Sequence, residues 1–336
     1  MNKTIRLMEV CGTHTVAIAK AGIRSLLPNN IFLISGPGCP VCVTPQEDID
    51  RIIEIAKQKD VIFATFGDMI RVPGTNSSLE KERANGAEIR IVYSPLDCLK
   101  IAKENQSKQV VFMGVGFETT SPTIAATIIE SKRQKIKNFF VYPSFKLIPP
   151  AMKVLIDDPE LKIDGFICPG HVSTIIGSHP YEFLNKPCVI AGFEPNDILE
   201  AIEMLVEAVR AERRKVRIQY KRIVKPEGNP KALEILYKVF EPCDSNWRGL
   251  GVIPRSGLKF RKEFEKFDAS KKFEITGDIA QCRLSKGCIC GDILKGKQSP
   301  KDCKLFGKAC TPENPIGACM VSSEGTCAAR FKYETR

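Results

Sequence analysis

A repeating pattern in the first 210 residues constrains the fold more than any other feature, because short apolar runs alternate there with amphipathic stretches. The runs are rich in β-branched and aromatic residues and start some 20 to 30 residues apart, the length of a βα unit; they lie at 31–35, 61–66, 89–93, 110–115, 139–142, 166–168 and 188–193. Between them, residues 45–58, 94–105 and 194–214 place apolar side chains at helical spacing. Alternating strands and helices predict an α/β fold, with parallel sheets covered by helices on both faces.

A proline-rich break divides this pattern. Residues 137–150, KNFFVYPSFKLIPP, contain three prolines, so we expect two similar Rossmann-like lobes, at 1–125 and 126–215, rather than one sheet. Beyond Lys225 the alternation stops, and the C-terminal region is dense in cysteine, glycine and proline. A segment that buries little apolar surface needs another source of stability, which bound metal can supply. We therefore expect residues 216–336 to form a third domain that is held together partly by a cluster.

The composition indicates a cytoplasmic globular protein. Apolar residues make up 43% and charged residues 26% of the 336 positions, and no stretch approaches the ~20 apolar residues that cross a membrane. The first residues, MNKTIRLMEVCGTHT, lack the apolar run of a secretory signal. Because the cytosol keeps thiols reduced, the fourteen cysteines are expected to bind metal, exchange electrons or pack in the core. Cys98 and Cys188 stand in apolar surroundings and are expected to pack.

The net charge of +11 raises the question of nucleic-acid binding. Much of the charge lies in one stretch, residues 210–225, which reads RAERRKVRIQYKRIVK. Tyr220 is its single aromatic residue, so there is no series of interleaved aromatics, and no recognisable nucleic-acid-binding module accompanies it. A solvated helix end and linker is the favoured interpretation, although an acidic protein partner could use the same surface.

Small and polar residues gather in six loops that follow the predicted strands. Ligands bind beyond the C-terminal ends of the strands in open α/β sheets, where glycines let the backbone approach them. The loops are 9–15, 35–45, 65–75, 114–122, 168–173 and 191–197. Together they predict one functional site along that edge.

Two cysteine motifs in these loops are the most specific indications of chemical function. Cys39-Pro-Val-Cys42 resembles a thioredoxin-type dithiol, in which a nearby helix N-terminus lowers the pKa of a thiol; half of a structural zinc site is the alternative. Cys11-Gly-Thr-His14 offers a soft thiolate ligand and a histidine that could ligate, donate a proton or orient a bound group. A buried cysteine beside a capping threonine is the alternative there.

Three further side chains are candidates for the same site. Asp68 and Glu118 are carboxylates in glycine-bounded loops and suit binding, orientation or proton transfer, although either one alone is more often a solvated loop acid. His171 follows Pro169 and Gly170, which pin it in a turn, so a site role is favoured over a place in the core.

Seven cysteines mark the C-terminal region. Their spacing is loose and lacks the tight CxxC pairs of a zinc ribbon, which fits an iron–sulfur cluster held by several loops. Spacing alone does not select four ligands among the seven, which are Cys282, Cys288, Cys290, Cys303, Cys310, Cys319 and Cys327.

Ten short strings lie at intervals from Met8 to Ala329 and so span nearly the whole length of the chain: MEVCGTHT, GPGCPVCVTP, FGDMIRVPG, VYSPLD, GFETTSPT, PGHVSTIIG, AGFEPNDIL, WRGLGVIPRSGL, LFGKAC and MVSSEGTCAA. Together they resemble the HypD family of hydrogenase maturation proteins. The resemblance implies a protein that helps to build the iron centre of [NiFe] hydrogenases, an iron that carries carbon monoxide and two cyanides. It also implies two partners: a HypC-type small chaperone whose N-terminal cysteine shares the iron, and a HypE-type carrier that delivers cyanide as a thiocyanate.

The resemblance also implies roles for individual residues. Cys11 matches the family's iron-binding cysteine, and Cys39 and Cys42 match a dithiol thought to relay electrons. The family's cluster motifs imply a [4Fe–4S] cluster in the third domain, on Cys290, Cys303, Cys310 and Cys327. Cys282, Cys288 and Cys319 are then extra, and Cys288 beside Cys290 leaves the first ligand open.

We hypothesise that Fe(II) sits between Cys11 and the partner's cysteine. A dithiol supplies two electrons on forming its disulfide, as the release of cyanide from a thiocyanate requires, and a one-electron cluster reloads it in two steps. The polar residues of the strand-end loops then manage protons or anchor ligands; they are His14, Asp68, Glu118 and His171. Such a scaffold performs redox chemistry without turning over a free substrate, so whether it counts as an enzyme stays open.

Two other functions are considered. An iron–sulfur thiol–disulfide reductase resembling ferredoxin–thioredoxin reductase would depend on Cys39 and Cys42 and would dispense with Cys11. A zinc-stabilised nucleic-acid-binding protein would be colourless and would bind DNA or RNA in a salt-dependent way; it is not favoured.

Overall fold

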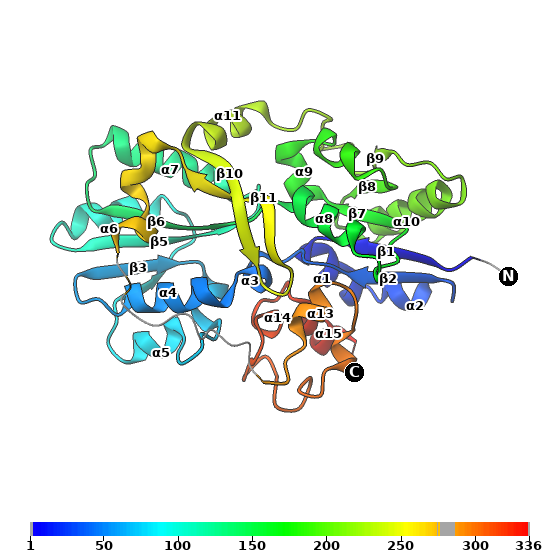
Figure 1. The fold of residues 1–336 in the computed structure, drawn as a ribbon, viewed down its shortest axis with the longest axis horizontal. Helices are drawn as coiled ribbons and strands as arrows, with labels where there is room; N and C mark the ends of the chain where they lie inside the picture. Colours follow the sequence, from blue (N-terminus) through cyan, green and yellow to red (C-terminus); the bar gives the residue numbers. More distant parts are fainter. Residues whose placement is uncertain (1–2, 274, 276–285, 335–336) are drawn as a thin grey trace.

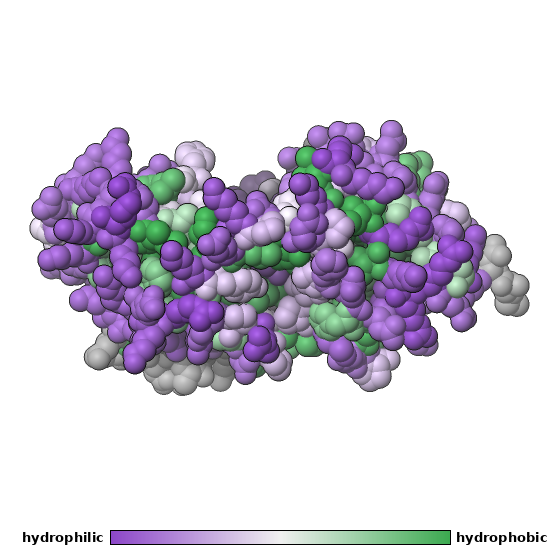
Figure 2. All heavy atoms as spheres, turned by 90° about the horizontal axis from the view of Figure 1, so that it is seen from above, coloured by the Kyte–Doolittle hydropathy of each residue, from purple (hydrophilic) through white to green (hydrophobic). Residues whose placement is uncertain are grey.

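A computed structural model of the chain describes residues 3–273, 275 and 286–334. It contains two parallel β-sheets side by side, with the last described residues packed beneath the place where they meet (Figure 1). Polar side chains cover most of the face shown in Figure 2, and apolar side chains show mainly in its depressions. Among the helices of the described residues, none has the length and apolar character to cross a membrane.

The five-stranded sheet has the order β2 (Ile31–Ser35), β1 (Ile5–Glu9), β7 (Gly165–Pro169), β8 (Cys188–Ala191) and β9 (Val216–Ile218), all parallel. One face packs against α1 (Gly12–Lys20) and α10 (Pro195–Arg210), which bury a cluster of isoleucines, leucines and valines. The other face packs against α8 (Ile148–Asp157), α9 (Gly170–Ile176) and η2 (His179–Leu184).

The four-stranded sheet has the order β4 (Ile89–Ile91), β3 (Val61–Thr65), β5 (Gln109–Gly116) and β6 (Phe139–Phe145), again all parallel. Helices α4 (Gln46–Ala56) and α5 (Leu79–Ala84) lie on one face, and α6 (Asp97–Glu104) and α7 (Ser121–Arg133) lie on the other. Helices on both faces of parallel sheets confirm the predicted α/β class.

The sheets are interleaved along the chain, so the boundaries predicted at residues 125 and 215 do not follow them. β1 and β2 leave the first half of the chain to pair with β7, and β6 lies beyond residue 125 but pairs with β5. Strand β1 itself was not among the predicted runs, because Arg6 and Glu9 interrupt its apolar residues. Local periodicity indicates where strands lie but not which strands pair, since pairing is a long-range contact.

The residues of the predicted third domain, 216–336, likewise pack in several separate parts of the structure. Strand β9 completes the five-stranded sheet. Helix α11 (Pro230–Val239) and the antiparallel hairpin of β10 (Phe240–Trp247) and β11 (Gly251–Phe260) then cover the four-stranded sheet, as do η3 (Lys262–Phe267) and α12 (Ala269–Lys272). The remaining helices lie at the junction of the sheets, below α1 and α3 in Figure 1; they are α13 (Cys290–Leu294), η5 (Pro300–Asp302), α14 (Ala318–Val321) and α15 (Thr326–Tyr333).

The turns that follow β1 and β2 pack directly on each other. The backbone N–H of Gly12 donates to the carbonyl oxygen of Gly38 across 2.8 Å. A Cβ atom on Gly38 would overlap the backbone nitrogen and Cα of Cys11, so only glycine fits there. This contact brings the ends of two neighbouring strands, and the cysteines that follow them, to one place.

Replacing Gly38 by alanine is expected to lower the free energy of unfolding by about 3 kcal/mol, because the obstructing atoms are backbone atoms that cannot rotate away. Urea denaturation followed by circular dichroism measures the change. Gly67→Ala is the matched control, since the nearest atom to its Cβ would be Ile91 Cγ2 at 3.9 Å. Equal losses in the two variants would show that the close approach is not what requires glycine at position 38.

Candidate functional site

Cys11 occupies the end of β1 and is the N-cap of α1. Its sulfur accepts no capping hydrogen bond, although the backbone N–H groups of His14 and Thr13 in the first turn of that helix favour the thiolate. Burial nevertheless raises the pKa of Cys11 to about 12, and the carboxylates of Glu324 and Glu9 add to the rise. The free thiol therefore stays protonated at neutral pH, and a bound cation is what would favour its thiolate.

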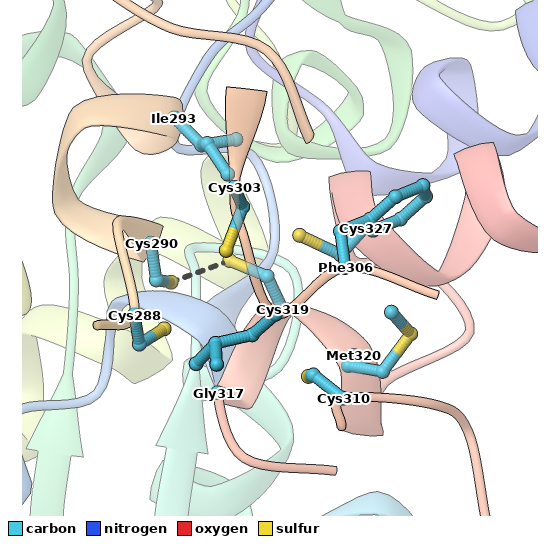
Figure 3. A pocket seen from close by; sticks show the side chains of 11 residues that line it. Cys288, Cys290, Ile293, Cys303, Phe306, Cys310, Gly317, Cys319, Met320 and Cys327 are labelled. Atoms are coloured by element: carbon cyan, nitrogen blue, oxygen red, sulfur yellow. Dashed lines mark hydrogen bonds between the residues drawn. The ribbon is translucent and has the colours of Figure 1, made fainter. Parts of the chain in front are cut away.

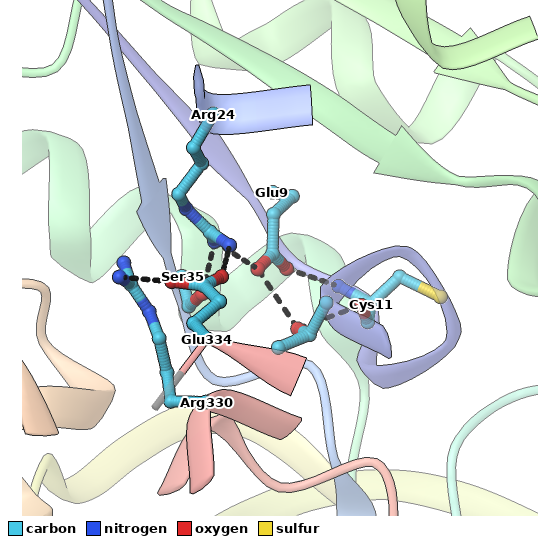
Figure 4. A network of polar contacts seen from close by, with 7 residues as sticks. Glu9, Cys11, Arg24, Ser35, Arg330 and Glu334 are labelled. Carbon is cyan, nitrogen blue, oxygen red and sulfur yellow. Dashed lines mark hydrogen bonds and ion pairs between the residues drawn. The ribbon is translucent and has the colours of Figure 1, made fainter. Parts of the chain in front are cut away.

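A buried carboxylate accepts hydrogen bonds from the Cys11 loop (Figure 4). Glu9 Oε1 accepts a hydrogen bond from Thr15 Oγ1 at 2.8 Å, and Oε2 accepts from the Cys11 N–H at 3.4 Å. Burial raises the pKa of Glu9 to about 7. Arg24 lies 4.0 Å from this carboxylate and forms a 2.7 Å ion pair with Glu334 at the end of α15. The sequence analysis did not single out Glu9 or Arg24, although Glu9 lies in the loop that was predicted to belong to the site.

The two predicted histidines come together around one phenylalanine. The ring of Phe193 stacks on His14 and on His171, with centroid distances of 4.8 and 4.0 Å. His14 Nε2 lies 2.8 Å from the carbonyl oxygen of Gly192 and therefore donates, which leaves a lone pair on Nδ1 without a hydrogen-bond partner among the described residues. Burial lowers the pKa of His14 to about 4, so its ring is neutral.

A C-terminal turn joins the Cys11 loop to the Asp68 loop. Glu324 Oε1 accepts a 2.7 Å hydrogen bond from Thr13 Oγ1, and its Cβ would stand 2.5 Å from a Cβ on Gly12. Ser322, two residues earlier, donates to Asp68 Oδ2 at 2.8 Å. The sequence analysis quoted the string that contains Glu324 but gave this residue no role, because nothing local places it beside a loop 311 positions away.

Glu118 lies in the loop after β5 and is hydrogen-bonded to the start of α8. It is buried, and its Oε1 accepts from the backbone N–H of Ile148 at the start of α8 across 3.0 Å. Its Oε2 has no hydrogen-bond partner among the described residues, and burial raises the pKa of Glu118 to about 8. Its hydrogen bond thus goes to the helix that connects the two sheets.

The CPVC dithiol is buried against the C-terminal region. Cys39 is the N-cap of α3 (Pro40–Val43), and its sulfur accepts from the Cys42 N–H at 3.3 Å. The thiol of Cys42 donates to the carbonyl oxygen of Ala318 across 3.9 Å, and Ala318 directly precedes Cys319 in α14. Burial raises the pKa of Cys42, so the lowering expected from a helix N-terminus does not prevail at this cysteine.

Six cysteines line one small pocket in the C-terminal region (Figure 3). They include the four cluster ligands implied by the family resemblance, together with two cysteines that it left as extra: Cys288, Cys290, Cys303, Cys310, Cys319 and Cys327. The sulfur atoms of Cys290 and Cys319 lie 2.7 Å apart. The rest of the wall is mainly apolar and includes Leu305, Phe306 and Met320.

Two cysteines outside the pocket, Cys98 and Cys188, are fully buried in the core, as predicted. Cys282 lies outside the described residues.

No three metal-binding side chains of the described residues converge tightly enough for a single metal ion. A four-iron cluster binds each thiolate to a different iron, so it does not require such convergence.

Comparisons with known proteins agree over the full length. A HypD family model, described as the hydrogenase formation hypA family, matches residues 1–334. The chain is 46% identical to the hydrogenase maturation factor HypD of Escherichia coli (strain K12) over 98% of this chain and 90% of the relative. The figures are the same for HypD of Rhodobacter capsulatus, and identity reaches 47% with HypD2 of Bradyrhizobium diazoefficiens over the same shares.

Glu118→Gln is expected to change how stability depends on pH. The raised pKa means that the unfolded chain loses this proton near pH 4.5 while the native state keeps it to about pH 8, so the wild type loses stability as pH rises between these values. Glutamine keeps the acceptor for Ile148 without titrating. Urea denaturation at pH 5 and pH 8 should therefore show the variant gaining on the order of 2 kcal/mol relative to wild type.

Glu104→Gln, at an exposed position, is the control for this comparison. Parallel pH profiles for the wild type and Glu118→Gln would mean that Glu118 is ionised in the native state.

Proposed function

Because this chain belongs to the HypD family, we propose that it is a hydrogenase maturation factor that holds an iron cargo at Cys11 while the iron acquires cyanide and carbon monoxide. The observation that carries the proposal is a junction of three thiol-bearing segments. The Cys11 loop packs on the turn that leads to Cys39, and Cys42 in turn lies beside Cys319 of the C-terminal pocket. Cargo site, dithiol and pocket are thus in consecutive contact.

The Cys11 loop suits a cationic cargo. The buried thiol must lose a proton to bind Fe(II), and the helix N–H groups around its sulfur stabilise the thiolate that forms. The neutral ring of His14, with a lone pair free on Nδ1, can accept a hydrogen bond from a ligand and so orient it. His171 is exposed on the other side of Phe193 and can exchange protons with solvent.

The remaining polar residues are assigned by their contacts. Asp68 is engaged by Ser322, so we assign it to holding the loops together at the edge of the cargo site. Glu118 is assigned to α8 rather than to the cargo. The partners implied by the family resemblance complete the proposal: a HypC-type chaperone whose cysteine shares the iron, and a HypE-type carrier that presents cyanide as a thiocyanate.

We assign the C-terminal pocket to a [4Fe–4S] cluster, because its donor set of cysteine thiols in an apolar wall is the chemistry that such clusters require. Cys290 is the less suitable first ligand, since it is already paired with Cys319 at 2.7 Å. The ligands we propose are Cys288, Cys303, Cys310 and Cys327. When bound, the cluster would supply electrons one at a time.

The other two pocket cysteines then form a thiol relay with the CPVC motif. Release of cyanide converts the carrier's thiocyanate and two electrons into a thiolate and a cyanide ion. Cys39 and Cys42 supply these electrons and release two protons as they form a disulfide. Cys319 can attack Cys42 of that disulfide, and Cys290 can then displace Cys42, which leaves a Cys290–Cys319 disulfide and a restored dithiol. Reduction of this last disulfide requires two electrons and two protons, and electron supply is the chemistry that a bound cluster would provide.

Cys288→Ala and Cys290→Ala test the ligand assignment. After anaerobic purification, Cys288→Ala should lose the visible absorbance and most of the iron and sulfide, whereas Cys290→Ala should keep about four irons, as a [4Fe–4S] cluster requires. The two residues are neighbours in one turn, so each variant is the control for the other. Loss of iron from Cys290→Ala with retention in Cys288→Ala would restore the ligand set implied by the family resemblance.

Cys11→Ala tests the cargo site and the proposed function. The variant should retain cluster iron but lack the additional iron and the infrared bands of bound cyanide and carbon monoxide that the wild type carries when expressed with its maturation partners. If both proteins lack such bands and the variant still reduces disulfides, the thiol–disulfide reductase function is favoured instead. A colourless wild-type protein that contains zinc would overturn the cluster assignment.

A further inference from the structure

The glycine turn that follows β8 is held from three sides. The carbonyl oxygen of Gly192 accepts a hydrogen bond from His14 Nε2 at 2.8 Å, and the N–H of Gly192 donates to Gln219 Oε1 at 3.0 Å. On the third side lies the Asp197 carboxylate, and a Cβ on Gly192 would stand only 2.2 Å from its Oδ2 atom. The carbonyl that His14 meets is therefore fixed by residues outside the Cys11 loop.

Asp197 is itself oriented by a bidentate ion pair. Arg222 Nη1 donates to its Oδ1 at 2.8 Å, and Nη2 donates to its Oδ2 at 2.6 Å. Two-point pairing fixes the plane of a carboxylate as well as its charge. Gln219 Nε2 donates to Oδ1 at 2.9 Å, so one glutamine joins this carboxylate to the Gly192 N–H. Arg222 also holds the pKa of Asp197 at about 2, so the carboxylate is ionised at neutral pH.

Arg222 also supports the aromatic ring that lies between the two histidines. Its guanidinium lies 4.5 Å from the ring centroid of Tyr220, and that ring meets Phe193 edge-on with the centroids 5.8 Å apart. Phe193 in turn stacks on His14 and on His171. The same arginine therefore supports His14 through the aromatic stack as well as through the carboxylate.

We infer that Asp197 and Arg222 are positioning residues that hold the His14 ring in one orientation and one tautomer. A carbonyl oxygen can only accept a hydrogen bond, so the Nε2 atom that faces Gly192 must carry the proton. Nδ1, which is buried without a hydrogen-bond partner among the described residues, is then the acceptor of the ring. The use of this acceptor by a ligand of the cargo rests on the proposed function, whereas the tautomer itself does not.

Nitrogen NMR of the imidazole ring measures the tautomer directly. The full-length protein, with 15N-labelled histidine rings, is expressed without its maturation partners and purified anaerobically. The signals of His14 are those that are missing from His14→Gln. At neutral pH the wild type should show a protonated Nε2 and an unprotonated Nδ1. In Arg222→Gln the ratio of the Nε2–H to the Nδ1–H tautomer should fall about fivefold, because the net contribution of one hydrogen bond to a fixed acceptor is lost.

Two further arginine variants distinguish positioning from a general effect of lost charge. Arg222→Lys keeps a cation beside Asp197, so its tautomer ratio should stay closer to that of the wild type. Arg217→Gln is the matched control, since it removes an arginine of β9 that pairs with Glu207 at 3.0 Å and should leave the ratio unchanged.

Gln219→Met tests the same turn with the arginine in place. It removes the acceptor of the Gly192 N–H and one donor to Asp197, so it should lower the tautomer ratio as well. Ratios within about twofold of the wild type in both Arg222→Gln and Gln219→Met would overturn the inference. If Arg222→Gln fails to fold, an unchanged ratio in Gln219→Met decides against the inference by itself.

Cargo loading distinguishes this inference from the proposed function. After expression with the maturation partners, Arg222→Gln should carry less iron beyond its cluster than Arg217→Gln and show weaker infrared bands of cyanide and carbon monoxide. A changed tautomer ratio with wild-type cargo loading would overturn the link between the His14 tautomer and the cargo. A wild type without these bands would overturn the proposed function, and the tautomer ratios alone would then decide the positioning role.

Discussion

The backbone contact between Gly38 and Cys11 fixes the position of the Cys11 loop relative to the CPVC motif. Strand β1 is paired on one side with β2 and on the other with β7, so its C-terminal end is held in the interior of a sheet. The turn that follows β2 lies on that end without an intervening side chain. The CPVC segment and the Cys11 loop therefore cannot separate unless neighbouring strands separate, which gives the site a rigid base.

Burial dominates the chemistry around this base. It raises the pKa values of Cys11 and Cys42 and lowers that of His14, so thiols and ring are neutral until a cation arrives. Under the proposed function, Cys11 would obtain positive charge from the iron cargo, so the ionisation of its thiol would respond to loading.

The C-terminal residues connect parts of the molecule that are far apart in the sequence. The turn before α15 bonds to Thr13 and Asp68, and the end of the helix pairs with Arg24. These bonds join the Cys11 loop, the edge of the four-stranded sheet and the cysteine pocket, because Cys327 lies in α15 itself. A change in the pocket is thereby connected through one short helix to the Cys11 loop.

The sequence by itself determined the α/β class, the loops that carry Cys11, Cys39 and Cys42, and membership of the HypD family. Strand and helix periodicity is local, and contiguous strings of reactive residues need no knowledge of the fold. Only the tertiary structure decided that the two sheets are interleaved, that Glu118 caps α8, and that Cys290 lies beside Cys319. Strand pairing, burial and contacts between distant residues decide these features, and none of them leaves a periodic signal along the chain.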